Sequence, residues 1–68
     1  MTLLNINGVD EEVVAATVAQ LLCARGIDPG ARFIAVAING AVVRRAEWPV
    51  ASLNAGDMVE IVRPLQGG

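Results

Sequence analysis

Two Asn-Gly dipeptides, beginning at positions 7 and 39, constrain the fold of this chain more than any other feature. Each lies between two stretches of residues with the apolar character of strands. A two-residue Asn-Gly loop is the strongest short-range signal for a β-hairpin, because both residues readily adopt the positive φ that a type I′ turn needs. We therefore predict two hairpins, formed by residues 2–7 with 9–15 and by residues 33–39 with 41–45.

The segment between the hairpins has the period of a helix. Thr17 is a candidate N-cap, and Gln20 follows three residues later, which is the capping-box pattern. Gly26 supplies a left-handed stop at the C-terminal end. A helix this short is not stable alone, so we expect it to pack against a sheet. The stripe predicted to make that contact consists of Val18, Leu21, Leu22 and Ala24.

Residues 58–64 form the last predicted strand, after an irregular crossover and a turn at residues 54–57. Val59 and Ile61 would face the core, and Trp48 is expected to cap it beneath the crossover. Residues 33–39 are the most apolar segment, and we place them centrally in the sheet. One helix that crosses one face of a mixed sheet of about five strands is an α+β roll.

Composition limits the function classes that remain. The 68 residues suffice for one domain, and the net charge of −2 does not suit a nucleic-acid binder or a polybasic membrane anchor. The chain has no His and one Cys, Cys23, which disfavours a metal site, an internal disulfide and histidine catalysis. We expect Cys23 to be a small buried hydrophobe. Without a signal-peptide pattern or a membrane span, the expected location is cytoplasmic.

The element order, followed by the terminal pair Gly67 and Gly68, resembles the β-grasp, or ubiquitin-like, fold. Within it, the segments "VAINGAVVRRAEW" and "LNAGDMVEIVRPLQGG" resemble the ThiS family of sulfur carriers. Arg44 departs from the pattern, since many members carry Pro there, and Pro64 stiffens the root of the tail more than is usual. The resemblance implies a β-grasp domain at residues 1–64 and a flexible tail at residues 65–68.

The resemblance also implies a function in thiamin (thiazole) biosynthesis. The Gly68 carboxylate would be adenylated, converted to a thiocarboxylate, and would then donate sulfur to thiazole synthase. The implied partners are a ThiF-type adenylating enzyme, a ThiG-type thiazole synthase and a sulfur donor such as a cysteine desulfurase, with no nucleic acid and no membrane. The chain would be a protein co-substrate and not an enzyme. It would bind no metal or cofactor itself, because ATP and Mg²⁺ belong to the partner.

The residues near the C-terminus suit such a tail. A glycine has no Cβ to collide with a narrow channel, so Gly67 would give Gly68 access to a nucleotide site. Gln66 and Leu65 would line the mouth of that channel. Apolar residues on the sheet face that the helix leaves uncovered would form a docking patch. They are Val62, Met58, Phe33, Ala35 and Ala37.

Three alternatives stay open. A MoaD-type small subunit of molybdopterin synthase would have the same fold and tail with another sulfur acceptor. A protein modifier would form isopeptide bonds; the chain contains no lysine, so it could not form chains on itself. A plain β-grasp interaction domain would not use the tail at all, and deletion of Gly68 would distinguish it from a carrier.

Overall fold

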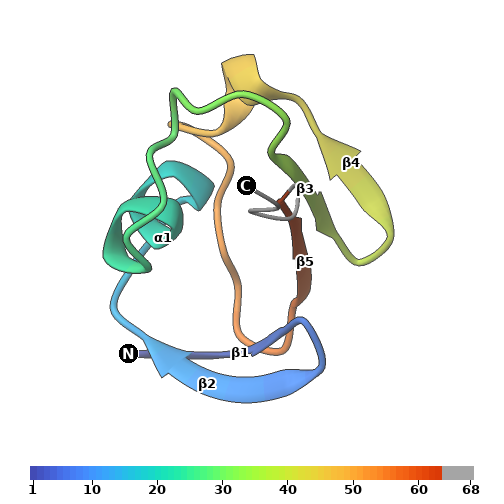
Figure 1. The fold of residues 1–68 in the computed structure, drawn as a ribbon. Coiled ribbons are helices and arrows are strands. Elements are labelled where there is room, and N and C mark those ends of the chain that lie inside the picture. The colour runs from blue at the N-terminus through green and yellow to red at the C-terminus, as the bar shows by residue number, and fades with distance from the viewer. Residues whose placement is uncertain (64–68) are drawn as a thin grey trace.

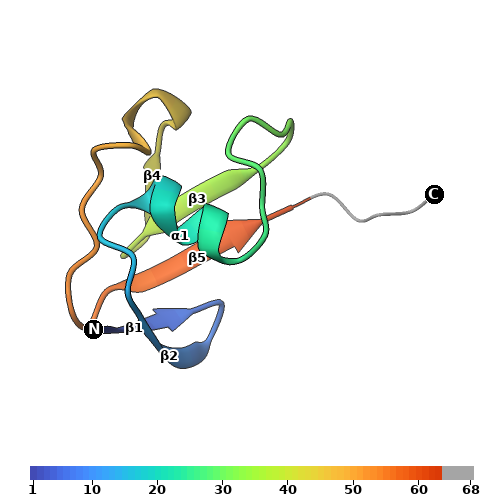
Figure 2. The same ribbon diagram turned by 90° about the vertical axis from the view of Figure 1, so that its left-hand side faces the viewer.

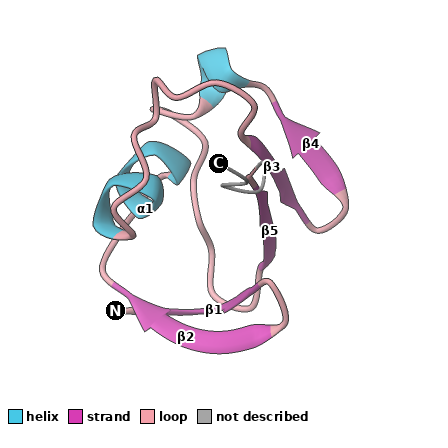
Figure 3. Ribbon diagram, in the orientation of Figure 1, coloured by secondary structure: helices cyan, strands magenta, loops and turns pink. Residues whose placement is uncertain are grey.

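The computed structural model describes residues 1–63 as a five-stranded sheet with one α-helix packed on one side (Figure 1). Turns and loops join these elements (Figure 3). The strands are β1 (Thr2–Ile6), β2 (Val9–Val13), β3 (Ala35–Ile38), β4 (Ala41–Val43) and β5 (Met58–Val62). The helices are α1 (Val18–Ala24), after β2, and the short 3₁₀ helix η1 (Arg45–Glu47), after β4.

The sheet has the order β2-β1-β5-β3-β4. Both predicted hairpins are present as antiparallel pairs, β1 with β2 and β3 with β4. Strand β5 lies between them, parallel to β1 and antiparallel to β3. The mixed sheet with one crossing helix confirms the predicted α+β roll. Our placement of residues 33–39 at the centre was wrong in detail, because β3 is an inner strand and β5 occupies the centre.

The two hairpin turns have the predicted backbone conformation. Asn7 and Gly8 have φ values of 50° and 88°, and Asn39 and Gly40 have values of 52° and 84°. Positive φ at both turn positions matches the right-handed twist of the flanking strands. Each two-residue turn therefore joins its strands directly, with Ile6 paired to Val9 and Ile38 paired to Ala41.

Helix α1 begins and ends as predicted. The Thr17 hydroxyl accepts a hydrogen bond from the Gln20 backbone N–H at 3.3 Å, and the Gln20 side chain accepts one from the Ala16 N–H at 2.8 Å. In a capping box the second bond comes from the N–H of the cap residue itself, whereas here it comes from Ala16, the residue before the cap. Gly26 has a φ of 75° and ends the helix.

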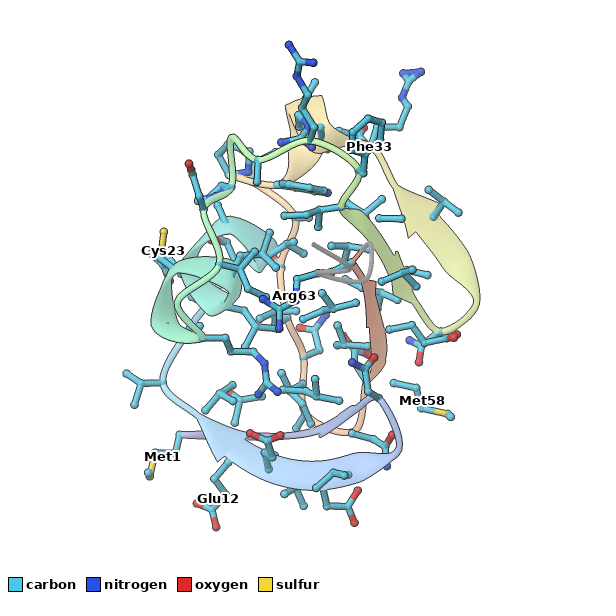
Figure 4. All side chains as sticks on the ribbon, viewed as in Figure 1. Met1, Glu12, Cys23, Phe33, Met58 and Arg63 are labelled. Atoms are coloured by element: carbon cyan, nitrogen blue, oxygen red, sulfur yellow. The ribbon has the colours of Figure 1, made fainter. Side chains whose placement is uncertain are left out.

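Two predictions about α1 were wrong. Val18, Leu21 and Leu22 are buried against the sheet, but Ala24 is exposed. Cys23 is exposed as well, and Figure 4 shows it on the outer side of the helix. At about 100° per residue, Cys23 lies nearly opposite the stripe centred on Leu21 and Leu22, and Ala24 lies at its margin.

The core lies between α1 and the sheet face beneath it (Figure 2). Trp48 is 2% exposed and closes the core under the crossover, as predicted. Its ring N–H donates to the Val43 carbonyl at 2.9 Å, so the indole is buried without losing a hydrogen bond. The buried side chains are Leu4, Ile6, Val18, Leu21, Leu22, Ile27, Val36, Trp48, Leu53, Val59 and Ile61.

Two arginines beside the crossover have structural explanations. The guanidinium of Arg45 donates to the carbonyls of Pro29 and Ala31 and lies 4.6 Å from the centroid of the Trp48 ring. It therefore ties the loop before β3 to η1. Arg44, where the family resemblance led us to expect Pro, has a φ of −67°. Proline adopts the same value, so the departure leaves the backbone conformation unchanged.

Candidate functional site

The sheet face opposite α1 carries exposed apolar side chains, and we call this surface the open face. Residues paired across neighbouring strands point to the same face of a sheet. The pairs are Ala35 with Val62, Ala37 with Val42, and Asn5 with Met58. Leu3 lies two residues before Asn5 on β1 and shares its side. The apolar members of the open face are therefore Leu3, Ala35, Ala37, Val42, Met58 and Val62.

Four of the predicted docking residues lie on this face. Met58 and Val62 are exposed on the central strand, and Ala35 is exposed on β3 beside Val62. Ala37 is half-buried and lies beside Glu60. Ala35 and Val62 are directly paired neighbours, whereas the exposed Glu60 lies between Met58 and Val62 on β5 and opposite Ala37. The structure thus brings these residues together, and their role in binding stays a prediction.

Phe33 differs from the predicted arrangement. We expected it to alternate with Ala35 and Ala37 along one strand, but β3 begins at Ala35. Phe33 lies in a turn with a φ of 65°, a value that an extended strand does not allow. Phe33 is 78% exposed, at the end of the molecule where β3 begins (Figure 4). The antiparallel register brings the same end of β3 next to the end of β5.

Val42 and Leu3 also lie on the open face, although they were not among the predicted docking residues. Val42 is 75% exposed and extends the open face onto β4. The signal was present, because a two-residue loop after Ile38 fixes the pairing of Ala37 with Val42. Leu3 extends the face onto β1 and follows from the same alternation that buries Leu4.

The open face is mostly apolar over β5, β3 and β4, where Glu60 is the exposed acidic residue between Met58 and Val62, and it is acidic over β2. Asp10 and Glu12 are exposed on β2, and the Asn5 amide donates to Asp10 at 2.9 Å. Glu11, between them on β2, points to the opposite face and forms a 3.0 Å ion pair with Arg25. A shallow depression of about 480 Å³ lies between the two regions. It is lined by Asn5, Asn7, Gly8, Met58, Val59 and Glu60.

The end of β5 is held from both edges. On one side its last partner is Ala35 of β3, opposite Val62. On the other side the Asn7 carboxamide makes two hydrogen bonds to the backbone of Ile61, at 2.8 and 3.2 Å. Arg63 follows on the side of β5 towards α1, whereas Met58 points away from it (Figure 4).

The predicted tail residues Leu65, Gln66, Gly67 and Gly68 lie outside the described residues, as does the domain boundary after residue 64. Within residues 1–63, no three His, Cys, Asp or Glu side chains gather closely enough to hold a metal ion. In the same part of the chain, no helix has the length and apolar character needed to cross a membrane.

Comparisons with known proteins agree with this architecture. A crystal structure of a thiamine biosynthesis protein (ThiS) from Geobacter metallireducens matches with a TM-score of 0.78 and 30% identity, over 98% of this chain and 100% of that one. A solution NMR structure of a thiamine biosynthesis protein from the same organism matches with a TM-score of 0.78 and 30% identity, over 98% of this chain and 88% of that one. No match was found among curated proteins.

The family comparison covers almost the whole sequence. The model of the ThiS family matches residues 3–68. This range contains both hairpins, the helix, the open face and the two terminal glycines. The β-grasp architecture and the family match agree, and the chain belongs to the ThiS family.

Proposed function

We propose that this chain is a sulfur carrier in thiamine biosynthesis, with the Gly68 carboxylate as its reacting group. The observation that carries the proposal is the ThiS family match, which extends through Gly67 and Gly68. The match to this family, rather than the fold alone, favours the thiazole route over the MoaD-type alternative. The chain is a co-substrate whose chemistry is completed by partner enzymes.

The proposed chemistry begins with activation of the Gly68 carboxylate, because a carboxylate is a poor electrophile. An oxygen of the Gly68 carboxylate attacks the α-phosphorus of ATP, which releases pyrophosphate and leaves an acyl-adenylate. A sulfur nucleophile then attacks the carboxyl carbon, and AMP leaves with the bonding electron pair. Hydrosulfide gives a thiocarboxylate at Gly68 directly, with loss of its proton. A donor persulfide gives an acyl disulfide, which a second thiol must cleave, so that the thiocarboxylate leaves and the donor sulfur and that thiol form a disulfide. The ThiF-type partner supplies the nucleotide site and the Mg²⁺ that offsets the phosphate charge.

The reach of the tail limits where that partner binds. The five residues after Arg63 can span at most about 17 Å when fully extended. The partner's nucleotide site must therefore lie within this distance of Arg63, the residue after β5, when the complex forms. A docking surface next to that end meets the requirement, and the open face includes Val62 there.

The apolar part of the open face is the proposed docking surface for the adenylating enzyme. Ordering the backbone of a tail costs about 1–2 kcal/mol per residue, so contacts elsewhere must offset that cost. Val62, Met58 and Val42 expose apolar surface whose burial is favourable at about 25 cal/mol per Å². Leu65 and Gln66 would contact the mouth of the channel, and a ThiG-type synthase and a sulfur donor such as a cysteine desulfurase act in the later steps.

The first test is the intact mass of the protein after reaction. The purified chain is incubated with ATP, Mg²⁺, a sulfide source and a ThiF-type enzyme. A mass gain equal to exchange of one oxygen for sulfur is expected, and deletion of Gly68 should abolish it. An unchanged mass, with an enzyme that modifies another carrier in the same assay, would contradict the proposal. Sulfur transfer to a molybdopterin precursor instead of a thiazole would support the MoaD-type alternative.

A second test concerns the channel. Gly67→Ala adds one methyl group next to the reacting residue, and we expect adenylation to slow by about tenfold or more, because small misplacements of reacting atoms are costly. Thermal unfolding should be unchanged, since the buried core is formed by residues between Leu4 and Ile61. Equal adenylation rates for variant and wild type would remove the argument for a narrow channel.

A further inference from the structure

The Asn7 side chain takes the place of a strand at the end of β5. The parallel pairing joins Asn5 to Met58 and Ile6 to Val59. The chain then turns away at Asn7, whose backbone N–H donates to the Val59 carbonyl at 2.9 Å. Beyond this point the edge of β5 would lack a partner. Instead, the Asn7 Oδ1 accepts from the Ile61 N–H at 2.8 Å, and its Nδ2 donates to the Ile61 carbonyl at 3.2 Å.

A carboxamide has the same donor and acceptor as a peptide group, so Asn7 continues the ladder by one more pair. The left-handed φ of 50° at Asn7 lets the backbone leave the sheet while the side chain stays on it. We call the two hydrogen bonds between the Asn7 side chain and the Ile61 backbone the clasp. Together with the pairing of Ala35 and Val62, the clasp holds β5 on both edges to within two residues of Arg63. The residues that follow are those on which the proposed chemistry depends.

We propose that Asn7 is a positioning residue for the reaction at Gly68, an inference that rests on the proposed function. By fixing Ile61, it keeps the segment that must be ordered on docking short and its origin constant. If the end of β5 came loose from residue 62, seven residues instead of five would have to be ordered in the partner's channel. Fewer docked complexes would then hold the carboxylate in line with ATP.

Asn39 offers a matched control within the same molecule. It occupies the same position of the other Asn-Gly turn, with a φ of 52°. Its side chain also bonds β5, but at the opposite end: Oδ1 accepts from the Met58 N–H at 3.0 Å, and Nδ2 donates to the Asp57 carboxylate at 3.0 Å. The two asparagines thus fasten the two ends of one strand, and Asn7 fastens the end next to the tail.

The test compares Asn7→Gly with Asn39→Gly. Glycine accepts the positive φ, so each substitution removes the carboxamide and keeps the turn. We expect faster hydrogen exchange at the Ile61 amide in Asn7→Gly and unchanged exchange there in Asn39→Gly. In adenylation with a ThiF-type enzyme, kcat should fall by about tenfold in Asn7→Gly, with KM within about twofold. Asn39→Gly should keep both constants within about twofold of wild type.

Several results would overturn the proposal. Equal losses of kcat in the two variants, measured where circular dichroism shows both to be folded, would assign the effect to stability. An unchanged kcat in Asn7→Gly, despite faster exchange at Ile61, would show that the reaction does not need the clasp. If Asn7→Gly does not fold, Asn7→Asp replaces it, because aspartate keeps an acceptor for the Ile61 N–H and loses the donor. A wild-type kcat in Asn7→Asp, together with faster exchange at the Ile61 amide, would count against the proposal.

Failure of the proposed function can be distinguished from failure of the positioning role of Asn7. A wild-type chain that ThiF-type enzymes do not adenylate would refute the carrier function, and the positioning role with it. The exchange rate at Ile61 would still report whether Asn7 holds the end of β5. A reactive wild type with a fully active Asn7→Gly would refute the positioning role alone.

Discussion

Neighbouring residues of β5 face two surfaces of very different kinds: Ile61 is 9% exposed, and Val62 is 59% exposed. Both are branched apolar side chains on the central strand. Ile61 points into the core beneath α1, whereas Val62 lies on the open face. The comparison teaches that apolar character alone does not tell a stabilising residue from one available to a partner. The position of α1 decides which of these two roles a residue can have, because the helix covers one face of the sheet and leaves the other face exposed.

The strongest test of this contrast uses two residues of β1. Ile6→Ala should lower the free energy of unfolding by about 2–5 kcal/mol, because Ile6 is 1% exposed and a cavity would remain. Leu3→Ala, on the open face of the same strand, should change it by about 0.5 kcal/mol or less. Urea unfolding of both variants measures the difference. Similar losses would mean that the open face also supports the fold.

The second prediction concerns docking. Val62→Asp should raise the dissociation constant for the ThiF-type partner by about tenfold or more, which corresponds to about 1.4 kcal/mol or more, because a charge would be buried at the interface. The fold should persist, since Val62 is already in water. Calorimetric titration gives the constant. Val50→Asp is the control, because Val50 is 74% exposed in the crossover, away from the open face. Equal affinities for both variants would contradict the proposed surface.

Val42 tests how far the docking surface extends. It lies on β4, at the edge of the sheet and two strands from β5. Residues at the rim of an interface contribute less than those at its centre, so Val42→Asp should weaken binding by about threefold, or about 0.6 kcal/mol. The same titration checks it. A loss as large as that of Val62→Asp would move the centre of the interface towards β4.

The smallest expected change in the free energy of unfolding is that of a substitution on the sheet face that α1 covers. Glu11→Gln removes the ion pair with Arg25, whose two side chains are about one-third exposed. Exposed pairs of this kind contribute about 0.5 kcal/mol or less, and the contribution falls with added salt. Urea unfolding at low and high salt measures it. Partner affinity should not change, and a clear loss of affinity would indicate that docking extends around the β2 edge.

Much of the fold could be predicted because its signals are local. The Asn-Gly turns, the Thr17 cap, the Gly26 stop and the alternation along β5 each depend on a few adjacent residues. Which strand lies at the centre depends on how the whole sheet is covered, and not on a few adjacent residues. A continuous apolar run marks a strand that is covered on both faces. In this sheet one face is uncovered, so the central strand alternates and resembles an edge strand in sequence.

The parts of the site that could not be predicted depend on contacts between distant residues. The bonds from Asn7 to Ile61 join residues 54 positions apart. Asparagine before glycine already has a sufficient explanation in the turn, so its sequence context gives no sign of a second contact. Phe33 has a left-handed φ that its aromatic character disfavours, and no local pattern indicates it. Val42, by contrast, was missed although the hairpin register alone places it on the open face.

The central position of β5 has a consequence for synthesis on the ribosome. The order β2-β1-β5-β3-β4 makes β5 the strand that joins the two hairpins, and within residues 1–63 it is the last strand to be translated. Two hairpins and a short helix can form earlier, but small isolated units of this kind are marginally stable in water. The sheet is completed when residues 58–62 emerge. Chains that terminate prematurely before β5 would therefore lack a stable fold, so nascent fragments would be open to proteolysis.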